Sequence, residues 1–251
     1  MKKTLTVLIL FIGITAFGQR PLKAPEGPAW LVMPSISLQY AGGDMAERFG
    51  QSYTAGMGIG YKTSDNWNFS LQGQFMFGSN VKNGAHLLDP VLSESGFLFN
   101  QTGEYATFTL DQRGAYGTFD VSKTIPDFFA ANRNSGFNIL LGAGYLAHWV
   151  KINNVGDDSP QVLDEYMKGY DELSGGFLLK QSIGYQYMSV NRRVNFRLSF
   201  EVMEAFTTNY RAFNYSTGKP VSGNFTDLVY GFRLEWILPI YSQPTSNYFY
   251  D

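Results

Sequence analysis

Two histidines are the residues of this 251-residue sequence best suited to acid–base catalysis. His86 lies close in sequence to Asp89, Ser93 and Glu94, whereas His148 stands apart from them. A histidine with a serine and a carboxylate could catalyse acyl transfer. However, Ser, Asp and Glu are common loop residues, and no G-x-S-x-G motif is present. The sequence also holds no Cys and no H-x-x-x-H spacing. We therefore expect no catalytic residue, no metal and no cofactor.

A group of charged residues in the C-terminal half is the more conspicuous cluster. These residues are Lys180, Arg197, Glu201, Arg233 and Glu235. Each lies in a segment where large apolar residues alternate with small or polar ones, and each shares the polar face. Antiparallel pairing of the last two segments would place the two arginines at similar heights, with both glutamates within reach. We interpret the cluster as structural ion pairs that fill a narrow lumen, because an unpaired charge there would be costly. A gated pore, or a proton or solute site, is the alternative.

The alternating segments predict eight strands. The clearest spans residues 137–149, where every second residue is large and apolar. The others cover residues 31–41, 52–61, 67–77, 108–121, 177–187, 194–202 and 228–238. In the fourth strand, Phe108 and Leu110 have one parity and Phe119 and Val121 the other, so we predict a β-bulge in the glycine-flanked stretch 113–117.

The composition indicates which face meets lipid. The chain contains 21 Phe, 16 Tyr, 4 Trp and 27 Gly. A small barrel could hardly hold so many aromatic side chains inside, whereas Gly, Ser, Asn and Gln suit a small polar lumen. A soluble sandwich or lipocalin-like barrel, the competing interpretation, would have the opposite facing. The sequence therefore predicts an all-β, eight-stranded, antiparallel, up-and-down transmembrane β-barrel.

The N-terminus has the pattern of an export signal. Lys2 and Lys3 precede an apolar run, and small residues at Ala16 and Gly18 form a cleavage site. We expect residues 1–18 to be a cleaved signal peptide, 19–29 a Pro-rich periplasmic lead-in, 30–241 the barrel and 242–251 a periplasmic aromatic tail. The formal net charge of −2 gives no electrostatic case for nucleic-acid binding.

The connections between strands predict the orientation. Those over residues 78–104, 151–176 and 207–224 are long, whereas those over 62–66 and 189–193 are short. Outer-membrane barrels have short periplasmic turns and longer external loops, so both termini should be periplasmic. In the loop 151–176, residues 160–168 could form a short helix with an apolar stripe.

The loop over residues 78–104 is too apolar to be freely solvated. Its apolar residues must fold over the barrel mouth, lie in the membrane interface or contact a protein. With the Pro-rich lead-in and the aromatic tail, they favour an interaction protein. The predicted docking residues are Leu87, Leu88, Val91, Leu92, Phe97, Leu98 and Phe99.

The signal ending Ala-Phe-Gly-Gln, the strands rich in Tyr, Phe and Asn, and the strand count resemble the small outer-membrane β-barrel proteins of the Bacteroidota, with OmpA/OmpX-type architecture. The resemblance covers the mature chain, although the periplasmic domain of OmpA has no counterpart here and no motif selects a subfamily. It implies a location in the outer membrane of a Gram-negative bacterium and implies no activity.

We therefore expect a non-catalytic barrel that serves as a structural or accessory subunit of a cell-envelope assembly. Its partners would be outer-membrane lipid and lipopolysaccharide, and other envelope proteins bound through its loops and periplasmic ends. A narrow outer-membrane channel is the second hypothesis, and a lipid A-modifying enzyme is the third.

Overall fold

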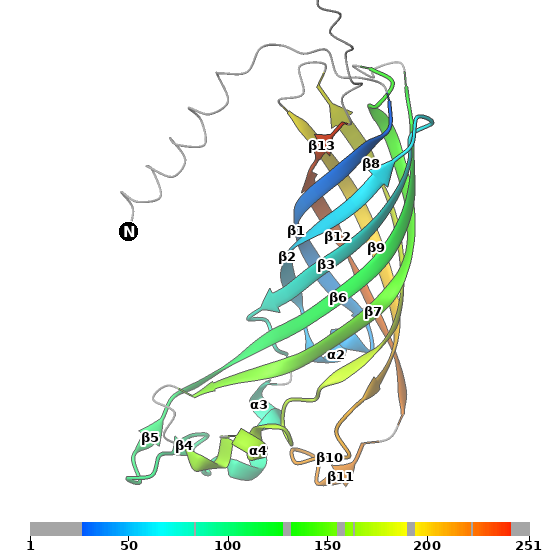
Figure 1. Cartoon of the computed structure of the whole chain (residues 1–251). Helices are drawn as coiled ribbons and strands as arrows, with labels where there is room; N and C mark the ends of the chain where they lie inside the picture. Colours follow the sequence, from blue (N-terminus) through cyan, green and yellow to red (C-terminus); the bar gives the residue numbers. More distant parts are fainter. Residues whose placement is uncertain are drawn as a thin grey trace, which may run out of the picture.

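The predicted eight-stranded barrel is confirmed in the computed structural model, which describes residues 27–82, 84–127, 132–154, 159–162, 164–189, 194–221 and 223–241. Each long strand pairs antiparallel with the next, and the last pairs with the first, so the sheet closes (Figure 1). The strands are β1 (Ala29–Gly43), β2 (Gln51–Lys62), β3 (Trp67–Gly78), β6 (Phe108–Ile125), β7 (Gly136–Asn154), β8 (Ser174–Met188), β9 (Asn195–Asn209) and β12 (Asn224–Trp236). A short strand, β13 (Leu238–Ile240), follows Ile237 and pairs with the start of β1. The predicted signal peptide and C-terminal tail, and most of the lead-in, lie outside the described residues.

The strand register makes the barrel narrow. Paired residues, followed once around the sheet, lead from Gly42 of β1 back to Val32 of the same strand, a shift of ten residues. Such a shift tilts the strands against the barrel axis, and an eight-stranded barrel then has an interior that side chains can fill.

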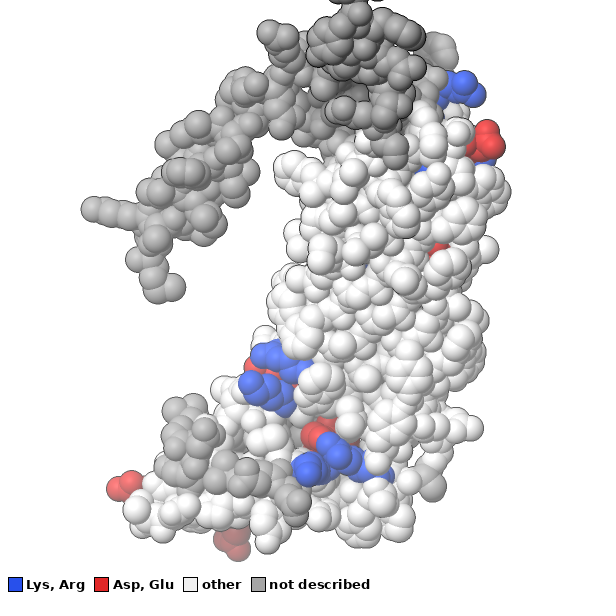
Figure 2. All heavy atoms as spheres, viewed as in Figure 1, with Lys and Arg blue, Asp and Glu red and all other residues white. Residues whose placement is uncertain are grey.

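The two faces of the wall are those of a transmembrane barrel. On β12, Leu234 and Trp236 are 45% and 53% exposed, whereas Arg233 and Glu235, which alternate with them, are 2% and 1% exposed. The same alternation runs along the other strands. Figure 2 shows few charged side chains on the visible wall between its two ends. Apolar residues outside and charged residues inside are the reverse of a soluble barrel.

Aromatic residues face outward near both ends of the strands, as expected at the two membrane interfaces. At the end with short turns, Lys123 lies over the ring of Trp67, 5.0 Å from its centroid. The belt of outward-facing aromatic residues at this end includes Trp30, Tyr61, Trp67, Phe137, Tyr185, Phe196 and Trp236. The belt at the other end includes Tyr40, Tyr53, Phe77, Tyr145, Phe177 and Tyr230.

The predicted β-bulge in β6 was wrong. Strand β6 pairs residue for residue with both β3 and β7 across the whole of 113–117. Phe119 faces lipid, but Phe108 and Leu110 lie on the inward face, where they pack against an apolar cluster in the barrel mouth. The apolar residues therefore change from one face of β6 to the other because the strand leaves the membrane there, and no extra residue is inserted into the pairing.

The long connections all lie at one end of the barrel (Figure 1). They contain α2 (Met45–Arg48), α3 (Gly84–Leu87), β4 (Leu98–Phe99), β5 (Tyr105–Ala106), α4 (Asp164–Met167), β10 (Phe213–Asn214), β11 (Lys219–Pro220), and the 3₁₀ turns Asp89–Val91 and Pro160–Val162. The short helix predicted over 160–168 is thus a 3₁₀ turn followed by one α-helical turn. Side chains from these loops and from inward strand positions form the apolar cluster of the mouth, which includes Met45, Phe49, Met76, Leu88, Leu98, Leu146 and Val150.

Among the helices in the described part of the chain, none has the length and hydropathy needed to cross a bilayer.

Candidate functional site in the barrel lumen

Three ion pairs occupy the membrane-embedded lumen. Arg233 Nε lies 2.8 Å from Glu201 Oε2, and Arg197 Nη1 lies 3.1 Å from Glu235 Oε2. Lys180 Nζ lies 2.8 Å from Asp120 Oδ2. All six side chains are almost completely buried, and their three positive and three negative charges balance. The structure thus brings together the five charged residues selected from the sequence.

The register explains two of these pairs. Arg197 of β9 lies directly opposite Glu235 of β12, and Glu201 lies two residues along the strand from Ser199, the partner of Arg233. Because side chains two residues apart share a face, the guanidinium of Arg233 can reach the Glu201 carboxylate. The two arginines are therefore at similar heights, each beside its own glutamate.

Neutral side chains connect these ion pairs across the lumen. Gln72 on β3 donates to Glu235 Oε1 at 3.0 Å and accepts from Arg233 Nη1 at 2.9 Å. Gln39 on β1 donates to Glu201 Oε1 at 2.8 Å, and Arg233 donates to the hydroxyl of Tyr116 on β6. These hydrogen bonds join strands that do not neighbour one another in the sheet, so the side chains fill the cross-section of the lumen.

Four members of this lumen network were not identified from the sequence: Asp120, Tyr116, Gln39 and Gln72. Asp120 alternates with the lipid-facing Phe119 and could have been assigned to the lumen from that pattern. Its pairing with Lys180 was harder to anticipate because β7 lies between their strands. Asp120 pairs with Gly142 of β7, and Gly142 pairs with Lys180. Because Gly142 has no side chain, the Lys180 ammonium and the Asp120 carboxylate can reach each other across β7 on the lumen side.

A second polar cluster lies at the barrel end that carries the long loops. His148 Nε2 is 2.8 Å from Asp227 Oδ2, which also accepts from Thr207 Oγ1 at 2.6 Å. Arg48 of α2 lies 3.6 Å from Asp227 Oδ1 and donates to Ser174 Oγ at 3.3 Å. These contacts hold the short helix α2 against the inner wall.

The two histidines are in different settings. His148 is fully buried on the inward face of β7, as its parity predicts. His86 is exposed in α3, 3.0 Å from Asp89, and Ser93 accepts a hydrogen bond from the backbone of Phe97. In the described structure neither histidine is hydrogen-bonded to a serine hydroxyl, although His148 lies opposite Ser174 in the β7–β8 pairing, and no group of three His, Asp or Glu residues is arranged to hold a metal ion.

The predicted docking residues divide into two groups. Leu87, Leu88 and Leu98 are buried, and Val91 and Leu92 pack partly buried against the same apolar cluster of the mouth. These five therefore fold over the barrel mouth, one of the three positions that the sequence left open for this loop, and are buried there instead of being exposed for docking. Phe97 and Phe99 remain exposed and contact Tyr105, with ring centroids 4.7 and 5.4 Å apart.

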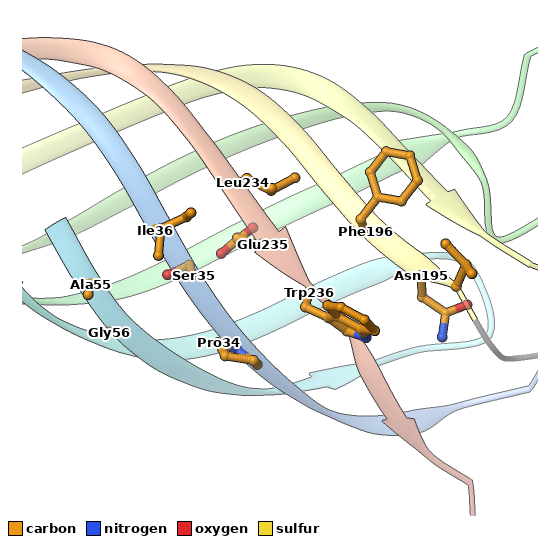
Figure 3. Close-up of a pocket in the computed structure, with 11 residues that line it drawn as sticks. Pro34, Ser35, Ile36, Ala55, Gly56, Asn195, Phe196, Leu234, Glu235 and Trp236 are labelled. Atoms are coloured by element: carbon orange, nitrogen blue, oxygen red, sulfur yellow. The ribbon is translucent and has the colours of Figure 1, made fainter. Parts of the chain in front are cut away.

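A hollow of about 580 Å³ lies in the lipid-facing wall between β1, β9 and β12 (Figure 3). Pro34, Ile36, Phe196, Leu234 and Trp236 surround it with apolar side chains. Glu235 and Ser35 lie at its base, but their side chains are buried in the lumen network. The hollow is thus part of the surface that contacts lipid.

No protein-family model matches this chain, and no curated protein sequence matches it. Among solved structures it is similar to Ail, the attachment invasion locus protein of Yersinia pestis, crystallised with the heparin analogue sucrose octasulfate (TM-score 0.40, 7% identity, covering 85% of this chain and 99% of Ail). It is also similar to Neisserial surface protein A (TM-score 0.38, 14% identity, covering 84% and 98%).

Proposed function

We propose that this chain is a non-catalytic barrel of the outer membrane of a Gram-negative bacterium, exported by its N-terminal signal, that acts as a structural or accessory subunit of an envelope assembly. The observation that carries the proposal is the filled lumen. Three buried ion pairs and the glutamines between them leave the external loops as the part of the described chain most available for binding. A Bacteroidota origin is part of this proposal and rests on the sequence resemblance alone.

The β4–β5 hairpin is the proposed docking surface. Its exposed aromatic residues are Phe97, Phe99 and Tyr105, the last 64% exposed. Three adjacent aromatic side chains in water are unfavourable unless a partner covers them, and aromatic residues dominate the binding energy of many interfaces. In Figure 1 the hairpin lies at the outer edge of the loop region, where another protein could reach it.

The experiment that tests this proposal is co-purification in mild detergent from the native membrane. The triple variant Phe97→Ser, Phe99→Ser and Tyr105→Ser should lose a co-purifying protein that the wild type retains, because it removes the exposed aromatic surface. The variant should still fold, because each of these side chains lies outside the buried cluster. Tyr166→Ser, which removes another exposed external aromatic residue, should retain it. A triple variant that folds and keeps every partner would refute the docking surface.

A further inference from the structure

A polar pocket at the external mouth has no role in the proposed docking. Its volume is about 480 Å³, within the range of small-molecule sites. Side chains of α2, the segment before β8, the end of β9, β10 and the start of β12 line it. It differs from the apolar hollow of Figure 3 because most of the residues that line it carry carboxylate or carboxamide side chains.

The walls of this pocket are held in place by contacts between loops. Arg211 donates through Nε to Asp171 Oδ1 at 2.9 Å and forms a second hydrogen bond to the same carboxylate. The hydrogen bond to Asp171 raises the pKa of Arg211, so the guanidinium stays charged. Asn214 Nδ2 donates to Glu172 Oε1 at 3.0 Å. The loops that present Glu172 and Asn214 are therefore joined before any ligand binds.

Arg48 forms the floor of the pocket. Its guanidinium carbon lies 5.7 Å from the ring centroids of both Phe49 and Phe225. Its nearest carboxylate is Asp227, at 3.6 Å. The Nη2 atom is buried and makes no hydrogen bond to the described residues. Arg48 Nη1 donates to Ser174 Oγ, so the guanidinium is fixed against the inner wall, and Asp227 balances its charge.

The remaining lining groups set the charge of the pocket. Asp44, Glu47 and Glu172 contribute three carboxylates. Asp44 Oδ2 already accepts from the backbone amide of Thr226 at 2.7 Å, whereas Glu47 is exposed and its carboxylate makes no hydrogen bond within the described structure. With Arg48 matched by Asp227, the pocket is net negative and disfavours a phosphate- or sulfate-rich ligand.

We propose that this pocket binds a saccharide that is neutral or carries an amine. A sugar hydroxyl both donates and accepts, so neighbouring hydroxyls can bind carboxylates and carboxamides at once. Asn209 and Asn224 supply carboxamides at the rim, and Phe225 supplies an apolar wall. The sugar could belong to the core of lipopolysaccharide in the same membrane or to a glycan from outside the cell. Both sources offer this chemistry.

Calorimetric titration of the full-length protein in detergent tests the inference. The probes are the dephosphorylated outer-core oligosaccharide of the host's lipopolysaccharide, free of acidic sugars, together with maltotriose, chitosan trisaccharide and sulfated maltotriose. At least one of the first three should bind, and the sulfated sugar should bind more weakly. Binding of the core alone identifies a ligand in the same membrane, and binding of a free trisaccharide identifies an external glycan.

A matched pair of variants locates the binding. Glu47→Ala with Asn224→Ala removes two exposed rim groups and should weaken binding about tenfold or more, since hydrogen bonds to charged groups are strong. Glu94→Ala removes an exposed carboxylate from another external loop and should leave the affinity unchanged. Unboiled gel mobility checks that both fold. The inference is overturned if none of the three uncharged or amine-bearing probes binds, if the double variant binds as the wild type does, or if the sulfated sugar binds most tightly.

Discussion

At the scale of single residues, the lumen depends on a glycine. A Cβ atom at Gly142 would lie 2.1 Å from Asp120 Oδ1. Gly142→Ala should therefore displace Asp120 and separate it from Lys180, at a cost of about 3–5 kcal/mol for breaking a buried pair. Thermal or urea unfolding followed on unboiled gels measures this cost. Gly73→Ala is the control because an added Cβ there meets no atom within 4 Å. Equal stability of the two variants would show that the Lys180–Asp120 pair is not held through Gly142.

The Arg233–Glu201 pair gives a second test at this scale. Glu201→Ala leaves the Arg233 guanidinium buried without its main carboxylate and should destabilise the barrel by about 3–5 kcal/mol. Combining it with Arg233→Met should recover much of that loss, because replacing both charges by apolar groups is often neutral. The same unfolding measurement applies. A double variant no more stable than Glu201→Ala would contradict a pairwise origin of the effect.

The histidines test the enzyme hypothesis. His86 is exposed, and His148 is hydrogen-bonded to Asp227, so neither is hydrogen-bonded to a serine or threonine hydroxyl in the described structure. His86→Ala and His148→Ala should leave the lipid A mass spectrum of the host unchanged. A changed spectrum in either variant would favour the lipid A-modifying enzyme.

The sequence pattern identified charged residues of the lumen more easily on adjacent strands than on strands separated by another strand. Alternation alone assigned Arg197, Glu201, Arg233 and Glu235 to one face, and adjacent strands brought them together. Asp120 was missed because its contact with Lys180 passes over an intervening strand, and the sequence does not contain the register that places Gly142 between them.

At the scale of strands, two lysine substitutions at the same height in the barrel wall test which side chains of β7 and β8 face lipid and which face the lumen. Leu140 of β7 pairs with Ser182 of β8, and the adjacent Leu141 points to lipid. Leu141→Lys should cost about 2–4 kcal/mol near the bilayer midplane. Ser182→Lys should cost less, because Ser182 lies opposite Glu201 on the lumen side. Folding into lipid vesicles across a urea series compares the two variants. The reverse ranking would assign lipid to the opposite face.

The alternation predicted all eight strands, but its meaning changes at the membrane boundary. Within the bilayer, a large apolar residue faces outward. Beyond it, Phe108 and Leu110 face inward, because the apolar cluster under the loops replaces lipid as their surroundings. The same change of surroundings explains why Leu87, Leu88 and Leu98 are buried over the barrel mouth. The sequence alone does not distinguish these residues from Phe97 and Phe99, which the folded loop leaves exposed.

At the scale of the whole molecule, the side chains that fill the lumen predict that the barrel does not conduct ions. The hydrogen bonds of Gln39, Gln72 and Tyr116 connect the ion pairs across the lumen, so an ion would have to break several of these contacts to pass. We expect purified wild-type barrel to give no steady conductance in planar lipid bilayers. Glu201→Ser with Arg233→Ser removes one negative and one positive charge, opens space for water and should produce measurable openings. Steady currents through the wild type would favour the channel, whereas a silent double variant would mean that other side chains, with Tyr116 the first candidate, also block the lumen.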